Sequence, residues 1–174
     1  MRTTDRSGLH FALAVALAFA MPCVHAQHAD CTVFGAVMDA VTREPLRGST
    51  VEALDRKWGR RLEAAAGDSG RYALDLGRNG EWEVTYAAPG YASKRLRILL
   101  VGIPPEDWAG GFGMHVDMTM LPEAAGIDYA LFDEPFGIAR YNGDSARLEW
   151  DMAHTERMRE RQRQLLEAIM PTAR

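Results

Sequence analysis

The strongest constraint on the fold is an alternation of apolar and polar side chains that recurs through residues 32–121. It is clearest in residues 81–86, where Trp82, Val84 and Tyr86 alternate with Glu and Thr. A β-strand directs successive side chains to opposite faces, whereas a helix buries residues three or four positions apart. The alternation therefore predicts half-buried strands, and we expect Trp82 to lie in the core.

Turn-forming residues separate these runs, for example the Gly-Asp-Ser-Gly sequence at 67–70 and the Pro-Gly pair at 89–90. Glycine and proline supply the backbone angles that a reversing chain needs. About seven strands, spaced roughly ten residues apart, favour an antiparallel β-sandwich or a barrel. We predict the sandwich, formed by residues 27–121. Further inward-facing positions are Tyr72, Leu74, Leu76, Leu96, Ile98, Leu100, Met114, Val116, Met118 and Met120.

The pattern changes in the last third of the chain. Residues 122–145 combine acidic and aromatic side chains without a sustained period, which predicts an ordered arm that packs through its aromatic rings. Residues 146–170 lack Gly and Pro, and Asp144 or Ser145 is suited to cap a helix there. Because charged side chains fill its middle, at 156–163, we expect this helix to be docked by its ends and solvated between them.

Polar residues interrupt the apolar stripe of the expected helix. The interruptions are Thr155 and Gln162, and His154 stands three residues after Asp151, a spacing typical of a pair on a helix surface. The apolar stripe itself consists of Leu148, Met152, Met158, Leu165, Leu166 and Ile169.

Residues 1–26 have the organisation of a secretory signal peptide. Two arginines precede an uncharged apolar run at 11–21, and a small-x-small triplet follows it. Eleven residues span about 16 Å as a helix, roughly half of a bilayer core, so the run predicts a cleaved signal and no membrane span after cleavage. We expect cleavage after Ala26 and a periplasmic or secreted protein. A lipoprotein anchored through Cys23 is the alternative.

Charge and cysteine content set further limits. The chain has 20 Lys plus Arg against 24 Asp plus Glu, a formal charge of -4, so a basic nucleic-acid-binding protein is excluded. After cleavage Cys31 is the one remaining cysteine, which excludes an internal disulfide framework. A disulfide between two chains through Cys31 stays open at this point.

Four motifs then follow one another in a recognisable order. They are FGAVMD at 34–39 with Thr42 and Pro45-Leu46, GSTV at 48–51, DSGRY at 68–72 and APGY at 88–91. This set resembles the carboxypeptidase regulatory-like domain, over about residues 31–100 and extending toward residue 121. The resemblance implies a transthyretin-like Greek-key fold, and therefore a seven-stranded antiparallel Greek-key β-sandwich followed by the arm and the helix.

The resemblance also bears on function. Domains of this family accompany peptidase catalytic domains, outer-membrane TonB-dependent transporters and bacterial surface proteins, where they act as structural or binding units. It implies a non-catalytic module and supplies no catalytic, metal-binding or cofactor-binding residues to carry over. The motif residues have structural explanations, since Asp39 shapes the turn after the first strand, and Gly70 and Gly90 free the backbone beside Tyr72 and Tyr91.

Two pairs of residues are candidate binding sites. His115 and Asp117 are two positions apart on one expected strand, so they share its outer face and could form an acid–base pair or two metal ligands, unless that face is simply solvated. Trp58 and Trp108 lie in expected loops, where exposed indoles stack on sugar rings and buried ones cover the ends of a sandwich.

These observations favour an exported, non-catalytic binding or scaffolding module with a protein partner in the cell envelope. The first alternative is a carbohydrate-binding module that uses Trp58 and Trp108. The second is a small hydrolase or metal-binding protein centred on His115 and Asp117. We predict no catalytic residue, no metal, no cofactor and no nucleic-acid partner.

Overall fold

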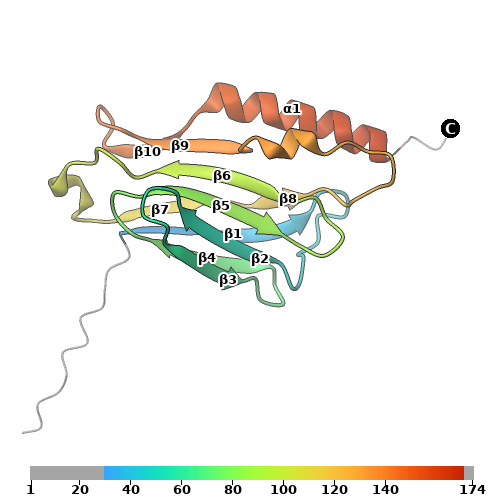
Figure 1. The fold of residues 1–174 in the computed structure, drawn as a ribbon, viewed down its shortest axis with the longest axis horizontal. Coiled ribbons are helices and arrows are strands. Elements are labelled where there is room, and N and C mark those ends of the chain that lie inside the picture. The colour runs from blue at the N-terminus through green and yellow to red at the C-terminus, as the bar shows by residue number, and fades with distance from the viewer. Residues whose placement is uncertain (1–29, 171–174) are drawn as a thin grey trace, which may run out of the picture.

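The computed structural model describes residues 30–170, so the predicted signal peptide and Cys23 lie outside the described residues. Within this range the chain forms a mainly β structure of two mixed sheets with one C-terminal α-helix (Figure 1), which confirms the sandwich class. The strands are β1 (Cys31–Asp39), β2 (Thr50–Asp55), β3 (Arg61–Ala65), β4 (Arg71–Leu76), β5 (Glu81–Ala87), β6 (Lys94–Leu99), β7 (Phe112–His115), β8 (Met118–Met120), β9 (Gly137–Asn142) and β10 (Arg147–Trp150).

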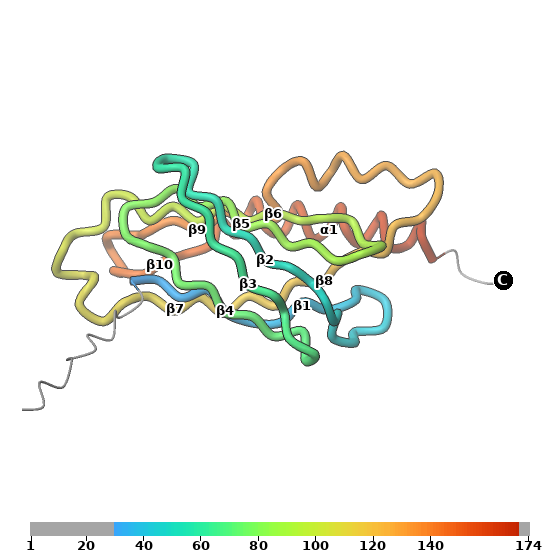
Figure 2. Tube along the Cα trace, turned by 60° about the horizontal axis from the view of Figure 1, so that its bottom comes forward, coloured from blue at the N-terminus to red at the C-terminus, as the bar shows by residue number. Residues whose placement is uncertain are grey.

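The smaller sheet is centred on β1, which pairs with β4 on one side and with β7 and then β8 on the other. The larger sheet has the order β10-β9-β6-β5-β2-β3. Two 3-10 helices lie in the connections, η1 (Pro105–Trp108) and η2 (Ala130–Asp133), and the chain ends in α1 (Met152–Ile169). In Figures 1 and 2 the segment that carries η2 lies beside the C-terminal half of α1.

The structure differs from the expected sheet in strand number and direction. Ten strands form within residues 30–170 instead of seven, and three pairings are parallel, namely β1 with β7, β1 with β8, and β6 with β9. The additional strands β9 and β10 come from the C-terminal third. They extend the larger sheet from β6, which covers an edge that the regulatory-like region alone would leave open.

One expected strand, residues 114–120, is broken into β7 and β8. The break lies opposite Gly35, where a Cβ atom would come within 2.0 Å of the Val116 carbonyl oxygen. Tyr72 donates to that oxygen at 2.9 Å, and the Asp117 carboxylate accepts the Ala36 N–H at 2.9 Å. The carboxylate oxygen of Asp117 therefore takes the place of a backbone carbonyl as the acceptor for β1, and the chain can bend between β7 and β8.

The inward faces follow the alternation in the sequence. All the predicted inward-facing positions of the sandwich are buried, and Trp82 is 1% exposed, with its indole Nε1–H donating to the Gly77 carbonyl at 3.1 Å. Between the sheets, the hydroxyls of Tyr72 and Tyr86 are 2.7 Å apart. Since Tyr72 donates its proton to Val116, Tyr86 is the donor in this pair. The core thus has a polar contact whose partners are satisfied.

The turn after β1 depends on Asp39, as the motif predicted. Its Oδ1 accepts the N–H groups of Val41 and Thr42, and its Oδ2 accepts the hydroxyl of Tyr91 at 2.7 Å. Gly70 has φ +68°, and a Cβ there would lie 2.7 Å from the Val37 carbonyl oxygen, so this position requires glycine.

The C-terminal third contains more regular structure than an arm and a helix. The helix begins at Met152 and not near residue 146, and Asp151 caps it by accepting the His154 N–H at 3.0 Å. Residues 147–150 form β10 instead, because Ala146 adopts a left-handed turn with φ +51° that a helix does not accommodate. Residues 122–145 include η2 and β9. No helix within residues 30–170 has both the length and the apolar surface to cross a bilayer.

The core role of Trp82 predicts a large loss of stability on truncation. Trp82→Ala should lower the free energy of unfolding by about 3–5 kcal/mol, because it leaves a cavity between the sheets. Trp58→Ala is the matched control, since Trp58 is 61% exposed and its loss should change stability by about 0.5 kcal/mol or less. Urea unfolding of both variants measures the difference, and equal losses would contradict the placement of Trp82.

Candidate ligand-binding groove

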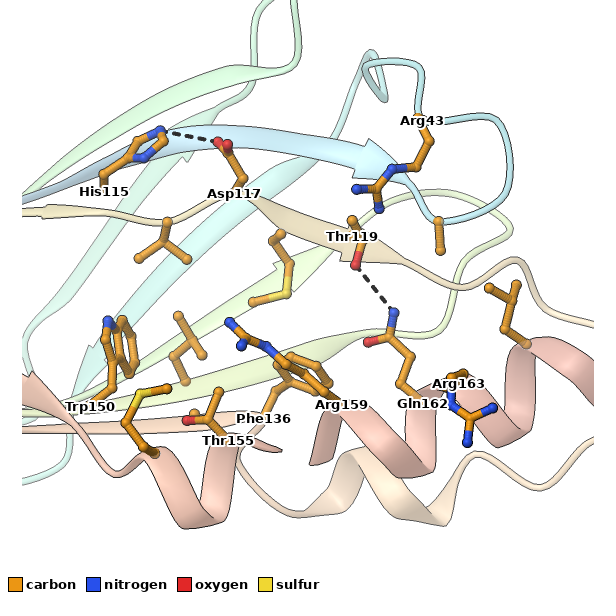
Figure 3. Close-up of a pocket in the computed structure, with 17 residues that line it drawn as sticks. Arg43, His115, Asp117, Thr119, Phe136, Trp150, Thr155, Arg159, Gln162 and Arg163 are labelled. Carbon is orange, nitrogen blue, oxygen red and sulfur yellow. Dashed lines mark hydrogen bonds and ion pairs between the residues drawn. The ribbon is translucent and has the colours of Figure 1, made fainter. Parts of the chain in front are cut away.

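A groove of about 390 Å³ lies between β8 and α1 (Figure 3). Its apolar lining comes from both sheets and from α1, and includes Leu96, Val116, Met118, Phe136, Trp150, Met152 and Leu166. A volume of this size is typical of sites that bury a small organic molecule. The regulatory-like region and the C-terminal third therefore meet in a concave surface that neither forms alone.

Lys94 holds the two walls of this groove together. Its side chain is fully buried, and its ammonium donates to the Thr119 carbonyl on β8 and to Oε1 of Gln162 on α1, the latter at 2.5 Å. Gln162 in turn donates to the Thr119 hydroxyl at 3.2 Å. One side chain from β6 in the larger sheet thus binds a strand of the smaller sheet and the helix.

Aromatic rings complete the surroundings of Lys94. Its Nζ lies 4.5 Å from the ring centroid of Phe136 and 5.1 Å from that of Phe132, distances at which a ring attracts a cation. Among the described residues, no carboxylate forms an ion pair with it. Because burial penalises the charged form, the pKa of Lys94 falls from 10.5 to about 7.

Three arginines stand at the groove, and they differ in their partners. Arg163 on α1 is held by Glu160 and Glu167, each at 2.6 Å, and Figure 3 shows its guanidinium turned away from β8. Arg159 extends from α1 into the space below β8, and Arg43 reaches the rim of the groove beside Thr119 from the turn after β1 (Figure 3). Within residues 30–170, neither Arg43 nor Arg159 takes part in an ion pair.

The predicted pair of His115 and Asp117 lies on the β8 side of this groove. Nε2 of His115 is 3.3 Å from Oδ1 of Asp117, and both side chains are exposed. The structure thus brings the two residues together as expected. Within the part of the chain that the structure describes, no third His, Cys, Asp or Glu joins them in a metal-binding cluster. Asp117 also has the structural role at the strand break described above.

The two predicted tryptophans do not form an open pair. Trp108 in η1 is 4% exposed and packs edge-on against Phe112, with Arg78 over its ring, so it is not available to stack on a sugar. Trp58 is exposed in the β2–β3 turn. Burial of Trp108 agrees with the expected alternative, packing over an end of the sandwich, and leaves Trp58 as the one exposed ring of the pair.

Asp55 fixes the turn that carries Trp58. Its carboxylate accepts the N–H groups of Lys57, Trp58 and Glu81 and pairs with Arg60 at 2.7 Å. Burial opposes its ionisation, but these hydrogen bonds, led by that from Arg60, outweigh burial and lower the pKa of Asp55. The turn is therefore an ordered feature of the sandwich end, away from the groove between β8 and α1.

His154 is not part of a surface pair with Asp151. Its side chain is buried, with Nε2 2.6 Å from the Pro135 carbonyl oxygen and Nδ1 2.8 Å from Arg157. An arginine can only donate and a carbonyl can only accept, so Nδ1 accepts and Nε2 carries the proton. This histidine joins the start of α1 to the segment before β9.

Sequence reasoning missed the polar residues that face inward at the groove. Lys94 alternates with the buried positions Leu96 and Ile98 on β6, and this spacing of two was the sequence signal that could have predicted its burial. Thr155 and Gln162 interrupt the apolar stripe of α1 because they lie on its inner face, where Thr155 is buried and Gln162 binds Lys94. The middle of the helix is therefore docked and not solvated on all sides.

Comparison with known proteins confirms the family resemblance. The sequence pattern described as the carboxypeptidase regulatory-like domain matches residues 32–105, so this part of the chain is similar to that family. It comprises β1 to β6 and the start of η1. The turn that carries Arg43 lies inside it, whereas β8 and α1 lie outside. No curated protein matches the chain.

Several solved structures are similar over about half of the chain. A hydroxyquinol 1,2-dioxygenase from Pseudomonas putida DLL-E4 is 12% identical over 53% of this chain and 56% of its own, with a TM-score of 0.36. A putative carbohydrate-binding protein from Bacteroides uniformis is 12% identical over 53% of this chain and 42% of its own, with a TM-score of 0.39. The group B streptococcus pilus 2b backbone protein is 12% identical over 55% of this chain and 42% of its own, with a TM-score of 0.37. The chain thus spans about half of the length of these proteins.

The buried Lys94 predicts a dependence of stability on pH. From about pH 7 to pH 10 the unfolded chain holds a proton on this amine that the folded chain has lost, so the free energy of unfolding should rise with pH, by up to about 1.4 kcal/mol per unit. Lys94→Met should remove this rise. Urea unfolding at several pH values between about 6.5 and 8.5 measures it.

Two controls isolate the effect of Lys94. Lys57→Met changes an exposed lysine in the β2–β3 turn and should leave the pH dependence unchanged. Burial raises the pKa of the Cys31 thiol from 9.0 to about 12, which lowers stability as pH rises above 9, so the comparison stays below that pH. The same rise in Lys94→Met as in the wild type would contradict the prediction.

Proposed function

We propose that this protein is an exported, non-catalytic binding module whose ligand occupies the groove between β8 and α1. The observation that carries the proposal is the groove itself, about 390 Å³ with an apolar floor and two arginines that have no ion-pair partner among residues 30–170. Binding sites commonly combine such an apolar lining with a few polar groups that orient the ligand.

The way the groove is built supports a binding role. Arg43 and Leu96 belong to the regulatory-like domain, whereas Met118 and Arg159 belong to the segments that follow it. Lys94 and Gln162 fix the distance between the walls through buried hydrogen bonds. A site whose walls are held by the fold loses little conformational entropy when a ligand binds.

The polar residues at the groove support binding more than catalysis. His115 and Asp117 are open to water, and Asp117 also accepts the Ala36 N–H. Catalytic acid–base pairs are commonly set in sites that exclude water. We therefore assign this pair to the structure of the strand break.

Export remains part of the proposal and rests on the sequence. Residues 1–26 have the pattern of a cleaved signal, which would place a mature chain beginning at Gln27 in the periplasm or outside the cell. A protein partner in the cell envelope stays a prediction. The groove gives the module a ligand site whether or not such a partner exists.

Two methionines with nearly equal exposure, one inside the groove and one outside it, provide a test of the proposal. Met152 lines the groove and is 52% exposed, whereas Met170, just beyond the other end of α1, is 51% exposed and lies outside the groove. Met152→Glu should abolish ligand retention because it places a charge against the apolar floor, and Met170→Glu should not.

Retention is measured on the protein expressed with its own signal and recovered from the periplasm. The protein is incubated with an extract of small molecules and lipids from the cell envelope, and native mass spectrometry detects the complex. A complex with the wild type and with Met170→Glu, but not with Met152→Glu, is expected. No complex with the wild type, or an equal complex with all three proteins, would contradict the proposed site.

A further inference from the structure

We infer that the groove between β8 and α1 binds an amphiphilic carboxylate, with its apolar body on the floor and its carboxylate between Arg43 and Arg159. This inference rests on the proposed function and names the class of its ligand. It follows from the floor, from the two arginines and from the bonds that already occupy the other polar groups of the groove.

The floor selects an apolar body. It is formed by Val116 and Met118 from the smaller sheet, Leu96 and Phe136 on the side of the larger sheet, and Trp150 at the end of β10. Burying apolar surface against such groups stabilises a complex by about 25 cal/mol per Å². A volume of about 390 Å³ accommodates a chain or ring system of small size, and it is too small for a folded partner.

The arginines select an anion. Arg43 and Arg159 line the groove on the β1 side and on α1 (Figure 3), and neither forms an ion pair among the residues described. Each guanidinium presents a planar fork of donors that matches the two oxygens of a carboxylate. Arg163, by contrast, is already neutralised by Glu160 and Glu167.

The backbone at Arg43 supports this assignment. Arg43 has φ +64°, a left-handed conformation that is unfavourable for a residue with a long side chain. Its N–H donates to the Asp39 carbonyl at 3.1 Å, and the Asp39 carboxylate orders the same turn through Val41 and Thr42. Such strain persists where surrounding contacts enforce it, and it often marks a functional position.

The other polar groups of the groove are engaged by the fold. Thr155 donates to the Asp151 carbonyl, and Thr119 accepts from Gln162. Asp117, which shares its oxygen with His115 and Ala36, brings the one carboxylate among the lining residues. Against the two arginines that are unpaired within residues 30–170, this one carboxylate leaves a single positive charge in excess at the groove, which suits a ligand with one carboxylate.

Three probes of equal chain length test the selection by charge. Decanoate, decanol and decyltrimethylammonium share an apolar body and carry a negative, a neutral and a positive head. The two charged probes are added to the protein below their critical micelle concentrations and decanol below its solubility limit, and binding is followed by isothermal calorimetry. The structure predicts that decanoate binds at least about tenfold more tightly than decanol, since one charge-assisted hydrogen bond accounts for a factor of that size. Decyltrimethylammonium should bind least.

Arginine variants test the position of the carboxylate. Arg43→Gln and Arg159→Gln should each weaken decanoate binding by about tenfold or more and leave decanol binding unchanged. Arg161→Gln is the matched control, because Arg161 lies on α1, pairs with Glu134 at 3.7 Å and does not line the groove. It should bind decanoate as the wild type does.

The outcomes separate the inference from the proposed function. Equal binding of decanoate and decanol, or unchanged decanoate binding in both arginine variants, would overturn the carboxylate assignment and leave the groove as a binding site. Failure of all three probes would also overturn the assignment. The proposed function would then depend on the separate retention experiment with Met152→Glu.

Discussion

The architecture around the groove depends on one buried amine. Lys94 extends from β6 of the larger sheet and donates to a carbonyl of β8 in the smaller sheet and to Gln162 on α1. Removing an ammonium group from water costs several kcal/mol unless hydrogen bonds and favourable electrostatics compensate. Here two oxygen acceptors and the faces of Phe132 and Phe136 offset part of that cost, and they do so only while β6, β8 and α1 stay in place.

The hydrogen bonds of Lys94 and Gln162 also cover the unpaired edge of the smaller sheet at β8. β8 pairs with β1 on one side only, and an unpaired strand edge is prone to pairing with other chains. Lys94 binds the outward-facing carbonyl of Thr119, and Gln162 binds its hydroxyl. The edge is thereby closed at this point, and the space left beside it, between β8 and α1, becomes the groove.

Sequence periodicity predicted the sandwich core because its inner faces obey a local rule. Trp82, Val84 and Tyr86 are buried as the alternation required, and the turn at Asp39 follows its motif. Contacts between distant segments were not visible in the same way. The break between β7 and β8 depends on Gly35 and Asp117, which are more than eighty positions apart, so local alternation continued through it.

The polar residues of the groove show why the candidate site was harder to predict. Lys94 and Gln162 occupy inward-facing positions of their elements, yet an inward Lys or Gln is favourable only when a partner from another element satisfies it. Their residue types therefore suggested solvent exposure, and only their register pointed inward. His115 and Asp117 were found because two adjacent positions on one strand face suffice to bring them together.

Hydrogen exchange of α1 tests most directly whether the contact between Lys94 and Gln162 holds the helix in place. Gln162→Ala removes the acceptor on the helix, and Gln164→Ala changes a nearby exposed glutamine that binds only Glu160 among the described residues. The structure predicts faster amide exchange across residues 152–169 in Gln162→Ala, with the core strands unchanged and Gln164→Ala like the wild type. Exchange in α1 that is equal in the wild type and Gln162→Ala would contradict the central role of this contact.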